Sequence, residues 1–263
     1  MKPLVLLGAL LVVVTTYEVL AVRERRGRGW SGGRSVTFAC GVLVAGVAVS
    51  PAFDERADAD FGMHGAQHLL LAMVAPLGLV LAAPLTLLLR QLPHRAARRL
   101  GRALGSWPVR LLTRPAVALL LSSGGLVVLY FTPLYELSTD HEAVHRLVHL
   151  HLVAAGTLFA WVIAGPDPTP HRASVRVRLV VLGLAVAVHA SVAQMLYAGI
   201  GVQVREPVHQ MRAAGNLMYF GGDIAELTLA LVVLLTWRSR RAASHRSGGA
   251  SRTGARGGPE AAA

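Results

Sequence analysis

Charged residues are scarce in this sequence. Asp, Glu, Lys and Arg make up 15% of the 263 residues, whereas 54% are hydrophobic, so an ordinary soluble surface is excluded. The single cysteine, Cys40, excludes an internal disulfide and any multi-cysteine metal site. The chain also lacks a phosphate-binding GxxxxGK[ST] loop, a convincing dinucleotide fingerprint and a serine-centred nucleophile elbow. We therefore do not expect an enzyme.

The apolar residues are gathered into runs near twenty residues long, which is typical of a polytopic α-helical membrane protein. We predict an all-α bundle of seven transmembrane helices. The predicted spans cover residues 4–22, 36–52, 66–89, 115–135, 144–164, 176–199 and 216–237. Pro76 and Pro84 should kink the third span, because each removes a backbone donor. A cleaved signal peptide is an alternative for the first span, but five arginines follow it without a clear cleavage site, which favours a retained helix.

Basic residues alternate along the chain between the ends of these spans. Four segments hold 21 of the 26 basic residues: 23–34, 90–114, 172–178 and the tail from Arg238. The alternate segments are acidic, so the positive-inside rule places the N-terminus outside and the C-terminus in the cytoplasm. This pattern also explains the net charge of +12 without a nucleic-acid partner. We expect one transmembrane domain, 1–237, followed by a disordered basic tail, 238–263.

Seven of the eleven histidines fall on or near the predicted outer face. His141, His145 and His149 are spaced four residues apart, and each such step drifts only about 40° around a helix, so the three rings share one face. His64 and His68 form a second pair of this kind at the start of the third span. Two such pairs at one membrane depth predict a shared metal site, whereas His141, His151 and His209 are weaker candidates.

Further polar residues are predicted deeper in the membrane. His189 lies in the middle of the sixth span, and Asp223 and Glu226 lie in the seventh. Buried carboxylates in a membrane are costly and normally face a partner or a water-filled cavity. We therefore add His189 and Asp223 to His64, His68, His145 and His149 as candidate metal ligands. Nearby methionines, including Met195 and Met218, favour Cu(I), because thioether and imidazole together suit that ion.

Four stretches together resemble a known family. They are MHGAQHLLLAMVAPLGLVLAAPL, TDHEAVHRLVHLHLVAAGTLFAW, the sixth-span His189 with Gln194 to Tyr197, and Gly221 to Glu226. The chain is similar to the CtaG-like assembly factors of cytochrome c oxidase from bacterial plasma membranes. The resemblance covers residues from about 61 to 237. The first two spans and the tail carry little of it.

The resemblance implies a seven-helix, non-catalytic protein that matures the haem–copper oxidase, with copper delivery to an oxidase subunit as its expected role. The implied partners are oxidase subunits, the lipid bilayer and copper carriers on the periplasmic side. Two alternatives stay open. One is a haem b electron carrier with two axial histidines on different helices. The other is a metal or proton permease, although no polar path continues below His189. A structural scaffold is a third possibility.

Overall fold

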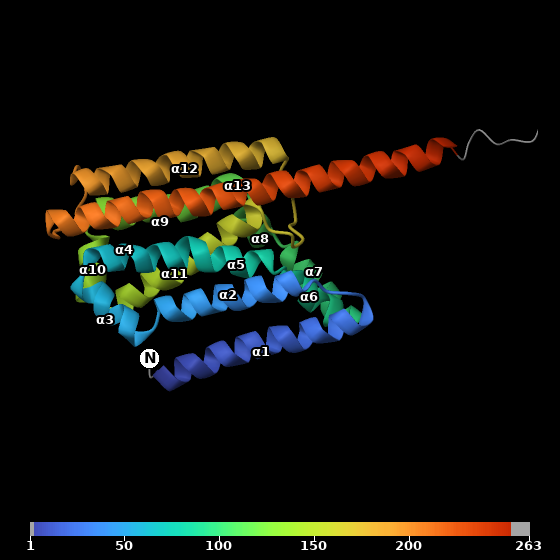
Figure 1. The fold of residues 1–263 in the computed structure, drawn as a ribbon, viewed down its shortest axis with the longest axis horizontal. Helices are drawn as coiled ribbons and strands as arrows, with labels where there is room; N and C mark the ends of the chain where they lie inside the picture. The colour runs from blue at the N-terminus through green and yellow to red at the C-terminus, as the bar shows by residue number, and fades with distance from the viewer. Residues whose placement is uncertain (1–2, 254–263) are drawn as a thin grey trace, which may run out of the picture.

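The computed structural model describes the backbone of residues 3–253 and the side-chain surroundings of residues 7–238. The described part of the chain is all-helical, as predicted, and contains no strand (Figure 1). The elements are α1 Pro3–Gly27, α2 Gly32–Ala48, α3 Pro51–Ala59, α4 Phe61–Leu69, η1 Leu70–Val74, α5 Ala75–Leu81, α6 Pro84–Gln91, α7 His94–Leu104, α8 Trp107–Leu112, α9 Pro115–Phe131, α10 Leu134–Asp140, α11 Glu142–Ile163, α12 Val175–Ala198 and α13 Val208–Thr253.

Several helices are long and apolar enough to cross a membrane. Within the described residues, four segments meet this condition by themselves: Phe61–Gln91, Glu142–Ile163, Val175–Ala198 and Val208–Arg238. Two bent pairs raise the number to six if each pair is one span. In these pairs α2 meets α3 at 53° and α9 meets α10 at 77°. The structure therefore supports a multi-pass membrane protein with four to six spans, and the seventh, over α1, stays a prediction.

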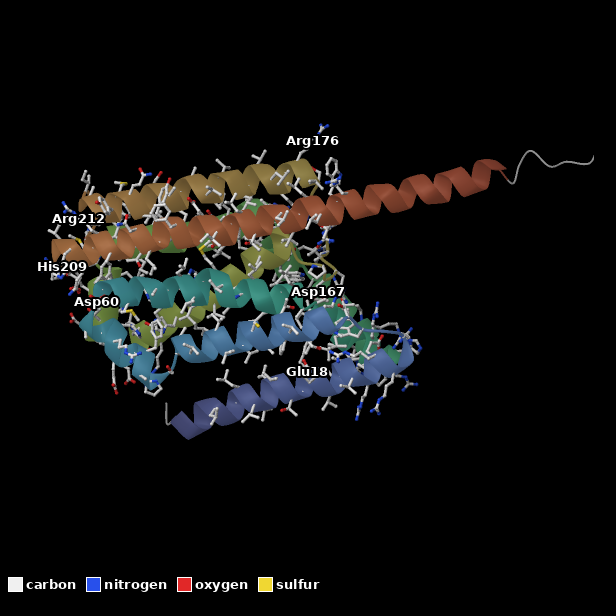
Figure 2. The ribbon with its side chains drawn as sticks, viewed as in Figure 1. Glu18, Asp60, Asp167, Arg176, His209 and Arg212 are labelled. Carbon is white, nitrogen blue, oxygen red and sulfur yellow. The ribbon has the colours of Figure 1, made fainter. Side chains whose placement is uncertain are left out.

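The long helices lie side by side, with their connections gathered at two opposite ends of the bundle (Figure 1). Asp60, His209 and Arg212 mark one end, and Asp167 and Arg176 mark the other (Figure 2). This grouping agrees with the alternation of acidic and arginine-rich segments in the sequence. The side of a membrane that each end faces stays a prediction.

The third predicted span is interrupted twice, in both cases beside a predicted proline kink. Before Pro76 the helix widens into the π-helical turn η1, where the Ala75 N–H donates to the Leu70 carbonyl. Before Pro84 the chain breaks at Ala83, which has a left-handed φ of 56°. Asp167 closes this break by accepting the backbone N–H groups of Leu85 at 3.1 Å and Thr86 at 2.7 Å. Each predicted kink position thus carries an interruption of the helix, whereas the bend itself stays a prediction.

Packing between α11 and the interrupted span is unusually close at one point. A Cβ atom on Gly156 would collide with the backbone carbonyl of Ala72, in η1. Glycine there lets two backbones touch, as in other close helix pairs of membrane proteins. His68 lies four residues before Ala72, and His149 lies seven residues before Gly156. This contact therefore sets the distance between the two helices that carry predicted ligands.

The end of the chain is helical further than the sequence predicted. α13 continues from the bundle to Thr253 and projects beyond the other helices (Figure 1). It therefore overlaps the first part of the predicted tail, 238–263. The last ten residues of that tail lie outside the described residues, so the division of the chain into a transmembrane domain and a tail stays a prediction.

Candidate functional site

The two predicted histidine pairs meet at the end of the bundle where α4 and α11 begin. α4 starts with Asp60 as its N-cap, whose carboxylate accepts the Met63 N–H at 2.9 Å. The next turns carry His64 and His68 on one face. α11 begins at Glu142 and presents His145 and His149 in the same way. The spacing of four residues on each helix and the equal depth of the two helices bring all four rings together.

We call His64, His68, His145 and His149 the histidine cluster. Within each helix the rings stack edge to face, with centroids 4.2 Å apart for His64 and His68 and 4.1 Å for His145 and His149. Across the helices the centroids are 5.7 Å apart for His64 and His145. For His68 and His149 the separation is 5.5 Å. The predicted contact between the two pairs is therefore present.

Most of the histidine cluster is withdrawn from solvent. His64 and His68 are 2% and 3% exposed, while His145 and His149 are half-buried. The Nε2 atoms of His64, His68 and His149 are buried and have no hydrogen-bond partner. Buried polar atoms in native proteins are nearly always satisfied, because an unpaired one costs free energy. These three nitrogens are therefore candidates for a ligand.

Aromatic side chains surround the cluster on the bundle side. The Tyr130 hydroxyl lies 3.3 Å from Nδ1 of His68. The rings of Phe61 and Tyr135 pack on His64, with centroids 6.2 Å and 5.3 Å away. These contacts fix the ring planes and leave the Nε2 edge of His68 without a protein partner. Sequence reasoning missed both tyrosines, although their place at the end of the fourth predicted span, level with the histidines, was a usable signal.

A broad acidic hollow opens beside the cluster, and we call it the acidic vestibule. It has a volume of about 770 Å3 and is lined by α3, α10 and the start of α11. Its acidic side chains are Asp54, Glu55, Asp58, Asp140 and Glu142. His145 and His149 form part of its wall. A smaller pocket of about 310 Å3 reaches His64 and includes Asp58, Asp60 and Glu206. Both approaches to the cluster are thus negatively charged, which favours cations.

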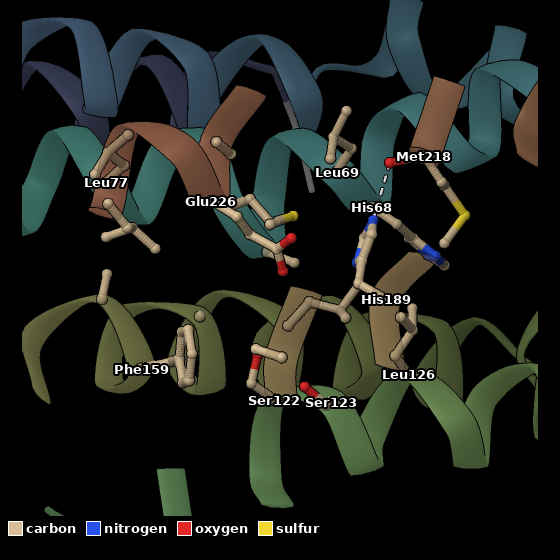
Figure 3. A pocket seen from close by; sticks show the side chains of 18 residues that line it. His68, Leu69, Leu77, Ser122, Ser123, Leu126, Phe159, His189, Met218 and Glu226 are labelled. Atoms are coloured by element: carbon tan, nitrogen blue, oxygen red, sulfur yellow. Dashed lines mark hydrogen bonds between the residues drawn. The ribbon is translucent and has the colours of Figure 1, made fainter. Parts of the chain in front are cut away.

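A second space, which we call the bundle cavity, lies deeper among the helices (Figure 3). It has a volume of about 60 Å3 and a mostly apolar lining. His68 and His189 border it, together with Glu226. His189 donates its Nε2 proton to the Met218 carbonyl at 2.9 Å. Glu226 is 3% exposed, and its Oε2 has no hydrogen-bond partner. The structure therefore places His189 beside His68 in this cavity, below the other rings.

Asp223, the candidate ligand on the seventh predicted span, lies outside the bundle cavity. It is half-buried on α13. It lies near enough to interact electrostatically with His189 and Glu226. The three weaker candidates are exposed: His141 is the N-cap of α11, His151 bonds the Leu121 carbonyl at 3.1 Å, and His209 lies at the start of α13. His141, His151 and His209 are thus not part of the cluster.

The rings of the cluster are close, but their nitrogens do not already converge on one point. Among the described residues, no three His, Cys, Asp or Glu side chains are arranged so that they could hold a metal ion together. Rotation about the side-chain bonds of the histidines would be needed to direct the unpaired nitrogens inwards. The metal-ligand roles of His64, His68, His145, His149, His189 and Asp223 therefore stay predictions.

Comparison with known proteins gives relatives of undescribed function. The chain is 31% identical over 177 residues to uncharacterized proteins of Mycobacterium bovis and Mycobacterium tuberculosis, which covers 65% of this chain and 27% of each relative. It is 31% identical over 194 residues to an uncharacterized protein of Mycobacterium leprae, covering 70% of this chain and 29% of that protein. The chain thus spans less than a third of the length of these relatives. No solved structure matches it.

The family comparison covers nearly all of the described bundle. The family described as cytochrome c oxidase caa3 assembly factor matches residues 15–240, which include every residue of the histidine cluster, the acidic vestibule and the bundle cavity. The match also extends the predicted resemblance to the second half of α1 and to α2. This chain therefore belongs to the family of cytochrome c oxidase caa3 assembly factors.

Proposed function

We propose that this protein assembles a haem–copper cytochrome c oxidase by binding copper at the histidine cluster and aiding its delivery to an oxidase subunit. Membership of the assembly-factor family supports the assembly role. The apolar helices support action within a membrane, which we take to be the bacterial plasma membrane. The partners are then oxidase subunits and the lipid bilayer, with copper carriers approaching on the periplasmic side. Copper is the cargo, and the protein is not an enzyme.

One observation carries the proposal: three buried imidazole nitrogens of the cluster, on His64, His68 and His149, have no partner. A neutral imidazole nitrogen is a good ligand for copper or zinc. A bound ion would satisfy all three nitrogens at once. The hydrogen bond between Tyr130 and Nδ1 of His68 is the kind of outer contact that orients ligating histidines.

The ring separations also suit a shared ion. Since a metal–imidazole nitrogen bond is about 2.0 to 2.1 Å long, ring centroids around one tetrahedral ion lie about 5 Å apart. The four measured separations, from 4.1 to 5.7 Å, bracket that value. Modest rotations of the rings, without movement of α4 or α11, would therefore complete the site.

The space around the cluster favours an ion over haem. A di-histidine haem needs room for a porphyrin between its axial ligands. The bundle cavity beside His68 has only about 60 Å3, far too little for a macrocycle. The acidic vestibule on the other side would attract cations and repel the haem propionates.

Asp223, half-buried near His189, would contribute charge balance to copper bound in the bundle.

The proposal is tested in cells that depend on this protein for their oxidase. His68→Ala and His145→Ala should each leave the oxidase subunits at normal abundance but lower their copper content and activity. His209→Ala, a change of an exposed histidine at the same end of the bundle, is the matched control and should leave both unchanged. Wild-type copper content in the oxidase of both cluster variants would refute the proposal.

A further inference from the structure

The bundle cavity contains donors that the histidine cluster does not use. Besides His68, its lining includes the thioethers Met73 and Met218, the imidazole of His189 and the carboxyl of Glu226. In Figure 3 the Glu226 carboxyl and the His189 ring point into the same space from α13 and α12. Thioether and imidazole donors in a dehydrated pocket select soft monovalent cations such as Cu(I).

His189 is already held in the tautomer that a ligand needs. Its Nε2 donates a proton to the Met218 carbonyl at 2.9 Å, so the neutral ring keeps the lone pair of Nδ1 free. Metal-ligating histidines usually donate their other ring N–H to a carbonyl or carboxylate in this way. Gly222 makes this position possible, because a Cβ atom there would collide with the His189 ring.

Glu226 lacks the partner that its position demands. Its side chain is 3% exposed at the depth of the apolar core, and Oε2 is buried without a hydrogen bond. Ionisable groups at such depth are normally paired or serve a transported ion, because burial of an uncompensated charge is costly. A monovalent cation that replaces the proton of the Glu226 carboxyl would keep the cavity electrically neutral and would give Oε2 the partner that it lacks. The four neutral imidazoles of the histidine cluster carry no charge that could balance a bound cation, whereas the Glu226 carboxylate does.

We infer that the bundle cavity is a second Cu(I) site, formed by Met73, His189, Met218 and Glu226. This inference rests on the proposed function, because the ion would arrive from the histidine cluster. His68 joins the two sites, since its ring lies 5.5 Å from that of His149 and also borders the cavity. Copper passes by exchange of ligands and remains Cu(I) throughout, so no electron donor or acceptor is required. The cavity holds the ion out of water after it leaves the acidic vestibule.

The test is titration of the detergent-purified full chain with chelator-buffered Cu(I). The wild type should bind about two ions per chain, and Glu226→Gln or a Met73→Leu/Met218→Leu double variant should bind about one. Glu18→Gln and Met211→Leu are the matched controls, because neither residue lines the cavity. They should keep both ions. His64→Ala/His145→Ala should lose the cluster ion, which separates the two sites.

X-ray absorption spectroscopy of the wild type, fully loaded with Cu(I), tests the second site without relying on a variant that could misfold. A sulfur neighbour of copper is expected, and it should disappear in the double methionine variant. One bound ion in the wild type, without a sulfur neighbour, would overturn the second site while leaving the proposed function intact. No bound Cu(I) at all, in any variant, would overturn both.

Discussion

Gly156 of α11 lies directly against the carbonyl of Ala72 in the π-helical turn, so that no side chain fits between them. The contact sits beneath the histidine cluster and couples the helix carrying His145 and His149 to the span carrying His64 and His68. Pro76, four residues after Ala72, cannot donate a hydrogen bond to that carbonyl. The proline and the glycine together thus shape the surface on which the two histidine pairs meet.

Gly156→Ala should push the two histidine pairs apart. Because the new methyl group would collide with backbone, which cannot rotate away, we expect a loss of stability of about 1 to 3 kcal/mol and weaker Cu(I) binding. Thermal unfolding in detergent and Cu(I) titration measure the two effects. Gly183→Ala is the matched control, since nothing lies within 4 Å of the added methyl group in α12. Equal behaviour of the two variants would contradict the role given to the Gly156 contact.

Tyr130→Phe should weaken copper binding without disturbing the fold. The change removes only the hydroxyl that lies 3.3 Å from Nδ1 of His68. Loss of such an outer contact typically lowers metal affinity about 10- to 100-fold. Competition with a Cu(I) chelator measures the affinity. Tyr197→Phe, at an exposed tyrosine of α12, should bind like the wild type. An unchanged affinity in Tyr130→Phe would show that the tyrosine does not orient His68.

The acidic vestibule should accelerate the arrival of cations. A triple variant, Asp58→Asn/Asp140→Asn/Glu142→Gln, removes three exposed charges from its wall and leaves the cluster intact. We expect stopped-flow binding of Ag(I), a soft monovalent probe, to slow about three- to tenfold at low salt. The difference should shrink as salt screens the field. Glu18→Gln, outside the vestibule, is the control. Identical rates for the triple variant and the wild type would exclude steering by these carboxylates.

Much of the histidine cluster could be predicted because it follows from helical periodicity. A spacing of four residues puts His64 with His68 and His145 with His149 on a common face. The charges of the connections place the two pairs at the same end of the bundle. The spacing within each helix and the depth of each helix in the membrane were enough to predict the contact. The structure accordingly shows the two pairs in contact.

The deeper site was harder to predict, since it depends on how helices rotate against one another. The sequence analysis predicted that His189, Asp223 and Glu226 lie deep in the membrane, and it added His189 and Asp223 to the four rings as candidate ligands. In the structure His189 faces the bundle cavity with Glu226, whereas Asp223 does not line it. Met73 was not predicted, because methionine is ordinary apolar filler and the π-helical turn that contains Met73 is not visible in the sequence. The bends between α2 and α3 and between α9 and α10 were likewise unforeseen, because each falls within one apolar run.

The most direct test of the account is metal analysis with an optical spectrum on detergent-purified protein. The wild type is compared with a His68→Ala/His145→Ala double variant after loading with Cu(I). The account predicts bound copper in the wild type, loss of the cluster copper in the double variant, and no Soret band in either. A Soret band that disappears in the double variant would contradict the account in favour of a haem carrier. A wild type that binds neither copper nor haem would contradict it in favour of a scaffold acting by contact alone.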